Sequence, residues 1–490
     1  MSSGPYAFKL LPKAIASIDL KCDWLERLAD YKSESPVMSK RISQFVALLI
    51  AFTLIFVALS AKYSSDAAAP QRPGTAAGGA TRNAAIIAAT AAVLKETSEI
   101  RELPILRPVR SGAQSRGEIE RMLVKNLDEQ MTAAEMHATE LSLRKFGLVS
   151  SDFQYRPFII KLLTEQVAGY YDARAREFHL ADWLDLEGQK PVMAHELTHA
   201  LQDQHFNLRR FEKWPHGDSD AELAVHALIE GDATLAMTIY KAKNPLVALA
   251  FTRSLTSSGI SSEQFNQAPR ALRESLIFPY LQGLEWTSQL YQRGGWDMVS
   301  KAFARLPLSS EQILHPEKYF NYEHPIKVVL PDFTNLLNSK ASGRRSTTRR
   351  PLPTLDWHRI DSDVNGEWNY SLILDQFLNS PAESRRAAAG WAGDRYALYE
   401  GSGHLIFLGQ IAAWDTENDA REFFDAYVKR TERRYPDAKP VELTLADSDD
   451  RRAWQTSEGG VVIELRGLRV LIIEGAPEGV DSKELVKAFG

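Results

Sequence analysis

Cysteine is almost missing from the sequence, and neither sign of charge dominates. Cys22 is the single cysteine among 490 residues, so no disulfide can form within the chain. Stability must therefore come from packing. The lack of disulfides is compatible with a location inside or outside the cytoplasm. Lys and Arg number 58 and Asp and Glu 63, and the formal net charge of −5 does not indicate nucleic-acid binding. The length suffices for two or three globular domains, and internal repeats are not apparent.

A short motif with metal-binding spacing lies near the middle of the chain. Between Ala194 and Phe206 the sequence reads AHELTHALQDQHF, which contains His195-Glu196-x-x-His199. Residues four apart lie on one face of a helix, so the two histidines are spaced to share a metal ion. Glu196 is placed beside them to take a proton from a metal-bound water. The motif predicts a zinc site in which Glu196 is the catalytic residue.

The helical pattern around the motif makes a chance match less plausible. An apolar stripe at helical spacing is formed by Met193, Leu197, Ala200 and Leu201. The two histidines fall on nearly the opposite side of the helix. We therefore expect the stripe to contact the hydrophobic core and the histidines to point away from that contact. The competing interpretation is a polar helix face that carries two surface histidines.

A second helix, predicted over Asp218–Tyr240, offers a further ligand. It begins with a capping box of Ser219 and Glu222. Glu230 lies off the apolar stripe of this helix and is followed by Gly231, which costs about 1 kcal/mol relative to alanine in mid-helix. Close approach of another helix or of the metal would explain this glycine. A zinc site with two histidines needs a third protein ligand and leaves one position for water. The predicted ligands of one Zn²⁺ are therefore His195, His199 and Glu230, and the alternative for Glu230 is a solvated side chain.

The two helices resemble those of the gluzincin metallopeptidases, the broad thermolysin-like class. The matching residues are His195, Glu196, His199 and Glu230. The resemblance implies that the first helix gives two ligands and the catalytic glutamate, and that the later helix gives the third ligand. Thr234 stands where this class has an acidic residue, while Asp232 lies two positions after the third ligand.

A wider pattern is similar to a family of bacterial secreted or membrane-anchored proteins. It spans most of residues 95 to 430. Its recurring pieces are EQVAGYYD (Glu165–Asp172), HELTHALQDQHFNL, ALIEGDAT, EQILHPEKYF (Glu311–Phe320) and GWAGDRYALYE (Gly390–Glu400).

Two acidic residues are candidates for holding the ligands in place, because ligating histidines usually donate their second ring N–H to an acceptor. Asp232 lies on the apolar stripe of its helix, where an unpaired carboxylate is costly, and so needs a ligand histidine or a buried arginine as partner. Asp203 lies one turn beyond His199. Ordinary helix polarity is the alternative for both.

A peptidase of this class also needs a donor for the developing oxyanion besides the metal. His226 lies one turn before Glu230 and could serve as this donor or replace Glu230 as a ligand. The full set of candidates is Tyr171, His226, Tyr280, His315 and Tyr319, and packing roles are the alternative for each. The alternating segment Arg176–Trp183 predicts a short strand. In the class that the chain resembles, this is an edge strand above the zinc that pairs with an extended substrate, and the alternative is a plain sheet edge.

One apolar run near the N-terminus predicts a transmembrane helix. Ile42–Ala61 contains no charged residue and has about the length of ~20 residues that spans a bilayer. Lys and Arg are more numerous before the run than after it, which favours a cytoplasmic N-terminus and a catalytic part outside the cytoplasm. The alternative is a cleaved signal peptide that starts at Met38 and ends at Ala58-Leu59-Ser60, which would make the protein secreted. A buried core helix is the third interpretation.

The sequence predicts an α+β protein with several units. A mostly helical, zincin-like catalytic domain with a small sheet is followed by a smaller C-terminal α+β domain, and one transmembrane helix precedes both. The predicted units are a cytoplasmic tail at 1–41, the transmembrane or signal segment at 42–61, a flexible linker at 62–82, the catalytic domain at 83–335, a basic polar linker at 336–355 and the C-terminal domain at 356–490.

Taken together, these features predict a zinc-dependent peptidase that acts on peptides or proteins outside the cytoplasm. The alternative is a non-hydrolytic envelope binding or scaffold protein with a structural zinc, for which His226 or Asp232 would also be on the metal. Hydrolysis of a non-peptide amide is a third interpretation.

Overall fold

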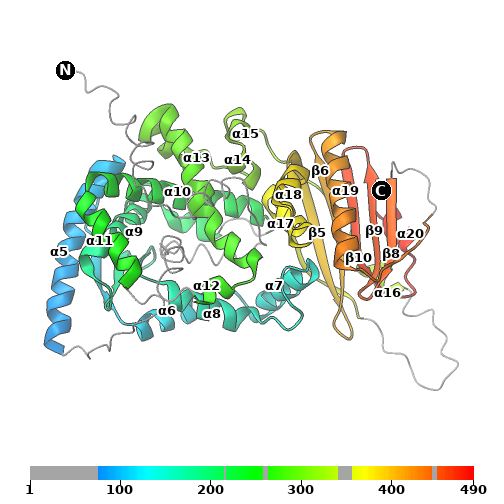
Figure 1. The fold of residues 1–490 in the computed structure, drawn as a ribbon, viewed down its shortest axis with the longest axis horizontal. Coiled ribbons are helices and arrows are strands. Elements are labelled where there is room, and N and C mark those ends of the chain that lie inside the picture. Colours follow the sequence, from blue (N-terminus) through cyan, green and yellow to red (C-terminus); the bar gives the residue numbers. More distant parts are fainter. Residues whose placement is uncertain (1–75, 214–216, 258–262, 340–355, 444–449, 490) are drawn as a thin grey trace.

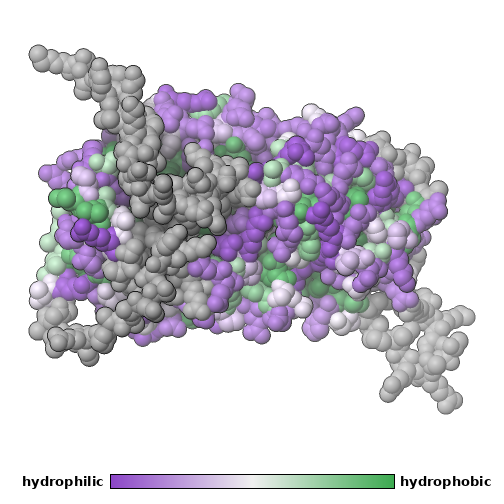
Figure 2. Space-filling model, viewed as in Figure 1, coloured by the Kyte–Doolittle hydropathy of each residue, from purple (hydrophilic) through white to green (hydrophobic). Residues whose placement is uncertain are grey.

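The computed structural model describes residues 76–489, except for 214–216, 258–262, 340–355 and 444–449. The described chain is elongated, with a helical half at one end and a large sheet at the other (Figure 1). On the face shown in Figure 2, hydrophilic residues predominate and hydrophobic ones lie in small groups, as expected where most apolar side chains are buried.

The helical half contains eleven α-helices, one 3-10 helix and a small sheet among the described residues. Its helices are α5 (Ala76–Arg101), α6 (Arg116–Gln130), α7 (Ala133–Lys145), α8 (Tyr155–Gln166), α9 (Leu186–Phe206), η2 (Leu208–Lys213), α10 (Ser219–Lys243), α11 (Pro245–Ser257), α12 (Glu263–Gln267), α13 (Arg270–Ala302), α14 (Ser310–Leu314) and α15 (Pro316–Asn321). Its strands are β1 (Arg110–Gln114), β2 (Gly169–Asp172) and β3 (Glu177–Ala181). Since α5 begins at Ala76, the end of the predicted flexible linker is helical.

Two features of the helical half correct the sequence interpretation. The strand order is β1-β3-β2, so β3 is the central strand and not the predicted sheet edge. β1 pairs with it in parallel and β2 pairs with it antiparallel. The second correction concerns the cap of α10, which is Asp218 and not Ser219. The Asp218 side chain accepts from the backbone N–H of Ala221, while the Ser219 hydroxyl donates to Asp363.

The C-terminal half is built on a seven-stranded antiparallel sheet with the order β4-β5-β6-β10-β9-β8-β7. The strands are β4 (His358–Asp363), β5 (Trp391–Gly401), β6 (Leu405–Trp414), β7 (Lys439–Pro440), β8 (Asp450–Thr456), β9 (Gly459–Arg466) and β10 (Arg469–Ala476). The helices are α16 (Thr334–Ser339), α17 (Gly366–Leu378), α18 (Pro381–Ala388), α19 (Glu417–Arg434) and α20 (Ser482–Lys487). Side chains alternate along β5, so Tyr396 and Leu398 pack with α17 and α19, and Ala397 and Tyr399 pack with α16 and α20.

The two halves share one hydrophobic core. Ile119 of α6 and Leu141 of α7 belong to the same buried cluster as Leu372 of α17 and Ile463 of β9. The predicted C-terminal unit is therefore packed on the helical unit over a continuous apolar surface.

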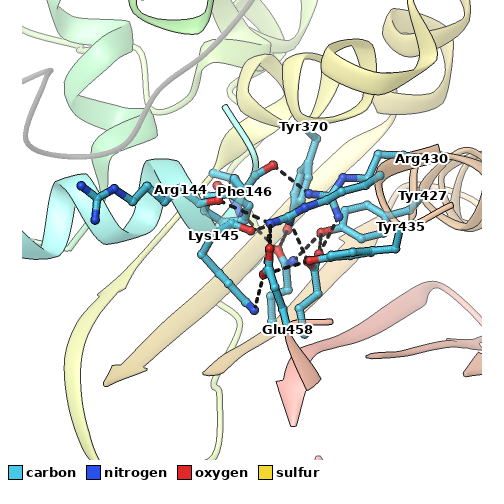
Figure 3. Close-up of polar contacts among 12 residues, drawn as sticks. Arg144, Lys145, Phe146, Tyr370, Tyr427, Arg430, Tyr435 and Glu458 are labelled. Carbon is cyan, nitrogen blue, oxygen red and sulfur yellow. Dashed lines mark hydrogen bonds and ion pairs between the residues drawn. The ribbon is translucent and has the colours of Figure 1, made fainter. Parts of the chain in front are cut away.

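A buried polar cluster also joins the halves (Figure 3). Arg430 of α19 donates to the Phe146 carbonyl oxygen at 2.8 Å, and Arg434 donates to that of Lys145 at 2.5 Å. Two cations thus cap the C-terminal end of α7, where backbone carbonyls have no helical partner. Both arginines also form ion pairs with Glu474 of β10, at 2.7 and 3.0 Å.

We expect this cluster to make the stability of the protein sensitive to acid. Burial by itself would raise the pKa of Glu474, but Arg430, Arg434 and Lys145 lower this pKa to about 2. Because the folded pKa is depressed, the stabilisation is present above the ordinary carboxyl pKa and is lost as the pH falls from about 4.5 to 2. Glu474→Gln should cost on the order of 3 kcal/mol of unfolding free energy at pH 7 and less at pH 3, measured by chemical denaturation.

The control for this experiment is Glu383→Gln. Glu383 pairs with Lys429 of α19, the helix that carries Arg430 and Arg434, and both side chains are partly exposed (28% and 43%), so its removal should cost less than about 1 kcal/mol. An unchanged difference between wild type and Glu474→Gln from pH 7 to pH 3 would contradict the assignment.

The predicted fold class needs one correction. The structure is α+β with two sheets, but none of the helices in the described ranges is long and apolar enough to cross a membrane. The apolar helices α11 and α17 have 13 residues each, and the longer α10 and α13 contain several charged residues. The predicted segment Ile42–Ala61 lies outside the described residues, and the expected location outside the cytoplasm stays a prediction.

Candidate metal centre

The predicted ligands come together between α9 and α10. His195 Nε2 lies 3.1 Å from His199 Nε2 and 3.1 Å from Glu230 Oε2, and His199 Nε2 lies 3.5 Å from the same oxygen. Ligands placed tetrahedrally around zinc at about 2.0–2.2 Å are about 3.3–3.6 Å from one another. The three atoms therefore fit one tetrahedral ion, and all three side chains are buried.

The protonation of these side chains also suits a metal. Burial lowers the pKa of His195, which favours the neutral ring that a metal ion requires. Burial opposes ionisation of Glu230, but its contacts with His199 and His195 lower its pKa to about 2. A neutral imidazole and an ionised carboxylate are the ligand forms of these groups.

A chain of buried polar groups holds His199. Its Nδ1 lies 2.8 Å from Gln202 Oε1, and the Gln202 amide donates to Asp232 Oδ2 at 2.9 Å and to the Ile229 carbonyl oxygen at 3.0 Å. Asp232 is paired through its other oxygen with Arg101. Asp232 thus has the buried arginine that its apolar position required, and it is linked to the predicted ligand His199 through Gln202.

Glu196 lies beside the ligands and is fully buried. Its Oε2 accepts a hydrogen bond from the backbone N–H of Tyr171 at 3.1 Å, and its Oε1 has no hydrogen-bond partner among the described residues. Burial, followed by the negative charge of Glu230, raises the pKa of Glu196 well above its ordinary value. A carboxylate that holds a proton more strongly is a better general base.

Gly231 permits a close crossing of α10 and α13. A Cβ at Gly231 would lie 2.2 Å from the Gly283 carbonyl oxygen, and one at Gly283 would lie 2.2 Å from that of Ala227. The close approach expected from the mid-helix glycine is therefore that of another helix. One turn before Gly283, the Tyr280 ring stacks on His195 with centroids 6.0 Å apart. Burial raises the pKa of Tyr280, and the charge of Glu230 and a hydrogen bond to that side chain act in the same direction.

Three of the other oxyanion candidates, Tyr171, Tyr319 and His315, have polar partners of their own. Tyr171 donates its hydroxyl to Asp203, which also pairs with Arg107. Tyr319 donates to the Arg305 carbonyl oxygen, and His315 lies 2.9 Å from Glu367 of α17. Tyr319 therefore has a packing role, and His315 takes part in the contact between the two halves.

Three further positions complete the comparison with the sequence. His226 is buried, and burial lowers its pKa to about 4. It does not belong to the group of ligand atoms found within the described ranges. Asp203 contacts neither ligand histidine, and its link to the site runs through Tyr171 to Glu196. Thr234, which stands where the resemblance led us to expect an acidic residue, is buried, and its hydroxyl has no hydrogen-bond partner among the described residues.

Sequence reasoning missed Gln202 and Arg101. Gln202 follows His199 by three positions and so shares its helix face, a signal that could have been used. Arg101 lies 131 residues from Asp232 in the chain, and no local pattern connects them.

Comparison with known proteins adds one family match. A family model described as a domain of unknown function (DUF8575) matches residues 353–485, which overlap the predicted C-terminal domain and lie outside the metal centre. No curated protein and no solved structure matches the chain.

Proposed function

We propose that the protein is a zinc-dependent peptidase with Glu196 as its general base. The observation that carries the proposal is the convergence of His195, His199 and Glu230 beside a buried carboxylate. Zinc bound there would supply Lewis-acid chemistry, which acidifies water and polarises a carbonyl group. Glu196 would take the proton of the attacking water and deliver it to the leaving amine.

Tyr280 is our candidate for the group that faces the developing oxyanion. It contacts two predicted ligands, because its ring stacks on His195 and its hydroxyl interacts with Glu230. The sheet edge beside the site is β2, whose Tyr171 N–H contacts Glu196, and an extended peptide would approach this edge and not the central β3.

A structural zinc in a non-hydrolytic binding protein is the second candidate. Full burial of His195, Glu196, His199 and Glu230 favours it, since a catalytic site must admit substrate and water. The number of candidate ligands favours the peptidase instead. Among the described residues the group has three members, and neither His226 nor Asp232 supplies a fourth ligand atom.

Zinc content and peptide cleavage test the proposal together. We expect the purified full chain to bind about one zinc and to cleave members of a peptide library, with cleavage lost on chelation and restored by zinc. Metal content is measured by mass spectrometry and cleavage by chromatography of the library. Zinc binding without metal-dependent cleavage of any peptide would favour the structural candidate.

A further inference from the structure

Two arginines, one at the end of α5 and one in the segment that follows it, are linked to the candidate metal centre by hydrogen bonds and ion pairs. Arg101 ends α5, and Arg107 lies before β1. The segment is held against the C-terminal end of α9: Gln204 Oε1 accepts from the backbone N–H groups of Leu106 and Arg107 at 2.8 and 3.0 Å. The two arginines are therefore fixed relative to the helix that carries the histidine motif.

The first chain of contacts runs from Arg101 to a metal ligand. Arg101 Nε lies 2.5 Å from Asp232 Oδ1, Gln202 donates to Asp232 Oδ2, and Gln202 Oε1 lies 2.8 Å from His199 Nδ1. All four side chains are buried, and Arg101 is also held by Ser300 Oγ at 3.2 Å. The whole chain is thus excluded from solvent.

The second chain runs from Arg107 to the general base. Arg107 Nη2 lies 2.6 Å from Asp203 Oδ2, and the Tyr171 hydroxyl donates to the same oxygen at 3.0 Å. The backbone N–H of Tyr171 then donates to Glu196 Oε2 at 3.1 Å. Arg107 thereby reaches Glu196 through Asp203 and one residue of β2.

We propose that Arg101 and Arg107 are positioning residues, Arg101 for the ligand His199 and Arg107 for Glu196. An arginine can only donate, so Asp232 beside it acts as an acceptor and requires the NH₂ group of Gln202. The Gln202 oxygen must then face His199, which places the imidazole proton on Nδ1 and leaves Nε2 for the metal. The Arg101 half needs only a metal at this site, whereas the catalytic consequence of the Arg107 half rests on the proposed function.

Asp232→Asn tests the Arg101 chain without changing its shape. The asparagine must turn its oxygen to Arg101 and its NH₂ group to Gln202, which reverses the Gln202 amide and disfavours the ligand tautomer of His199. We expect zinc affinity of the full chain, measured by chelator competition, to fall about 10- to 100-fold, with a changed visible spectrum of the Co²⁺ form. Arg101→Lys provides a second variant if Asp232→Asn does not fold.

The control is Asp375→Asn on α17, a buried aspartate that also pairs with an arginine, Arg270, but lies outside the candidate metal centre. It should bind zinc as tightly as the wild type. Wild-type zinc affinity in the folded Asp232→Asn or Arg101→Lys protein would overturn the Arg101 assignment. Equal weakening in Asp375→Asn would do the same, because it would show a general loss of structure.

Arg107→Gln tests the second chain. We expect unchanged zinc affinity, faster hydrogen exchange of the β2 amides at 169–172, and a kcat about tenfold lower with unchanged KM. Arg110→Gln is the control, since Arg110 is exposed and pairs with Glu177 away from Glu196. Exchange in β2 that stays as slow as in the wild type would overturn the assignment. A wild type that cleaves no peptide would refute the proposed function instead, and zinc affinity and exchange would still decide the roles of both arginines.

Discussion

Glu196→Gln is expected to lower kcat by about 10²- to 10⁴-fold while the protein still binds one zinc. The physical reason is that glutamine has nearly the same shape but cannot accept the proton of the attacking water. The backbone N–H of Tyr171, which now donates to Glu196 Oε2, can donate to the amide oxygen in the same way, so the position of the side chain should be kept. Zinc content and steady-state kinetics on a peptide from the library measure the two effects.

The control for this substitution is Glu187→Gln on the same helix. Glu187 is 62% exposed and pairs with Lys190, so its replacement should leave both zinc content and kcat unchanged. Equal cleavage by wild type and Glu196→Gln would rule out Glu196 as the base. Loss of zinc from Glu196→Gln would instead mean that Glu196 helps to hold the metal.

Gly231→Ala is expected to have the largest effect on stability, with a loss of about 3 kcal/mol or more and a weaker metal site. A normal carbon–oxygen contact needs more than 3 Å, whereas the new Cβ would lie 2.2 Å from the Gly283 carbonyl oxygen. The Cβ is bonded to the backbone of α10 and the oxygen belongs to the backbone of α13, so neither can turn away. The two helices would have to move apart by about 1 Å. Glu230 and Tyr280 lie on these two helices beside the crossing, and zinc affinity should fall together with the melting temperature.

Gly117→Ala is the matched control. Gly117 lies in the first turn of α6, and a Cβ there would meet only the Arg121 side chain, at 3.6 Å. Alanine should therefore leave zinc affinity unchanged and raise stability by up to about 1 kcal/mol. A Gly231→Ala protein with the melting temperature and zinc affinity of the wild type would show that the helices can separate at little cost.

The local parts of the site could be predicted from the sequence. Helical spacing by itself places His195 and His199 on one face, and the mid-helix position of Glu230 off the apolar stripe made it the predicted third ligand. The predicted strand over Arg176–Trp183 is present as β3, although its central place in the sheet was not predicted. Strand pairing joins segments that are distant in the chain, and alternation along one strand does not show which partners it has.

The sequence by itself determined that His195 and His199 lie on one face of a helix, because residues four apart are one helical turn from each other. The tertiary structure decided what surrounds them. Arg101 and Asp232 meet only because α5 and α10 pack side by side, and the two halves share a core only because apolar surfaces of α7 and the large sheet face each other. Such contacts depend on which surfaces meet in the folded chain, and the periodicity of one segment does not show which other segment it packs against.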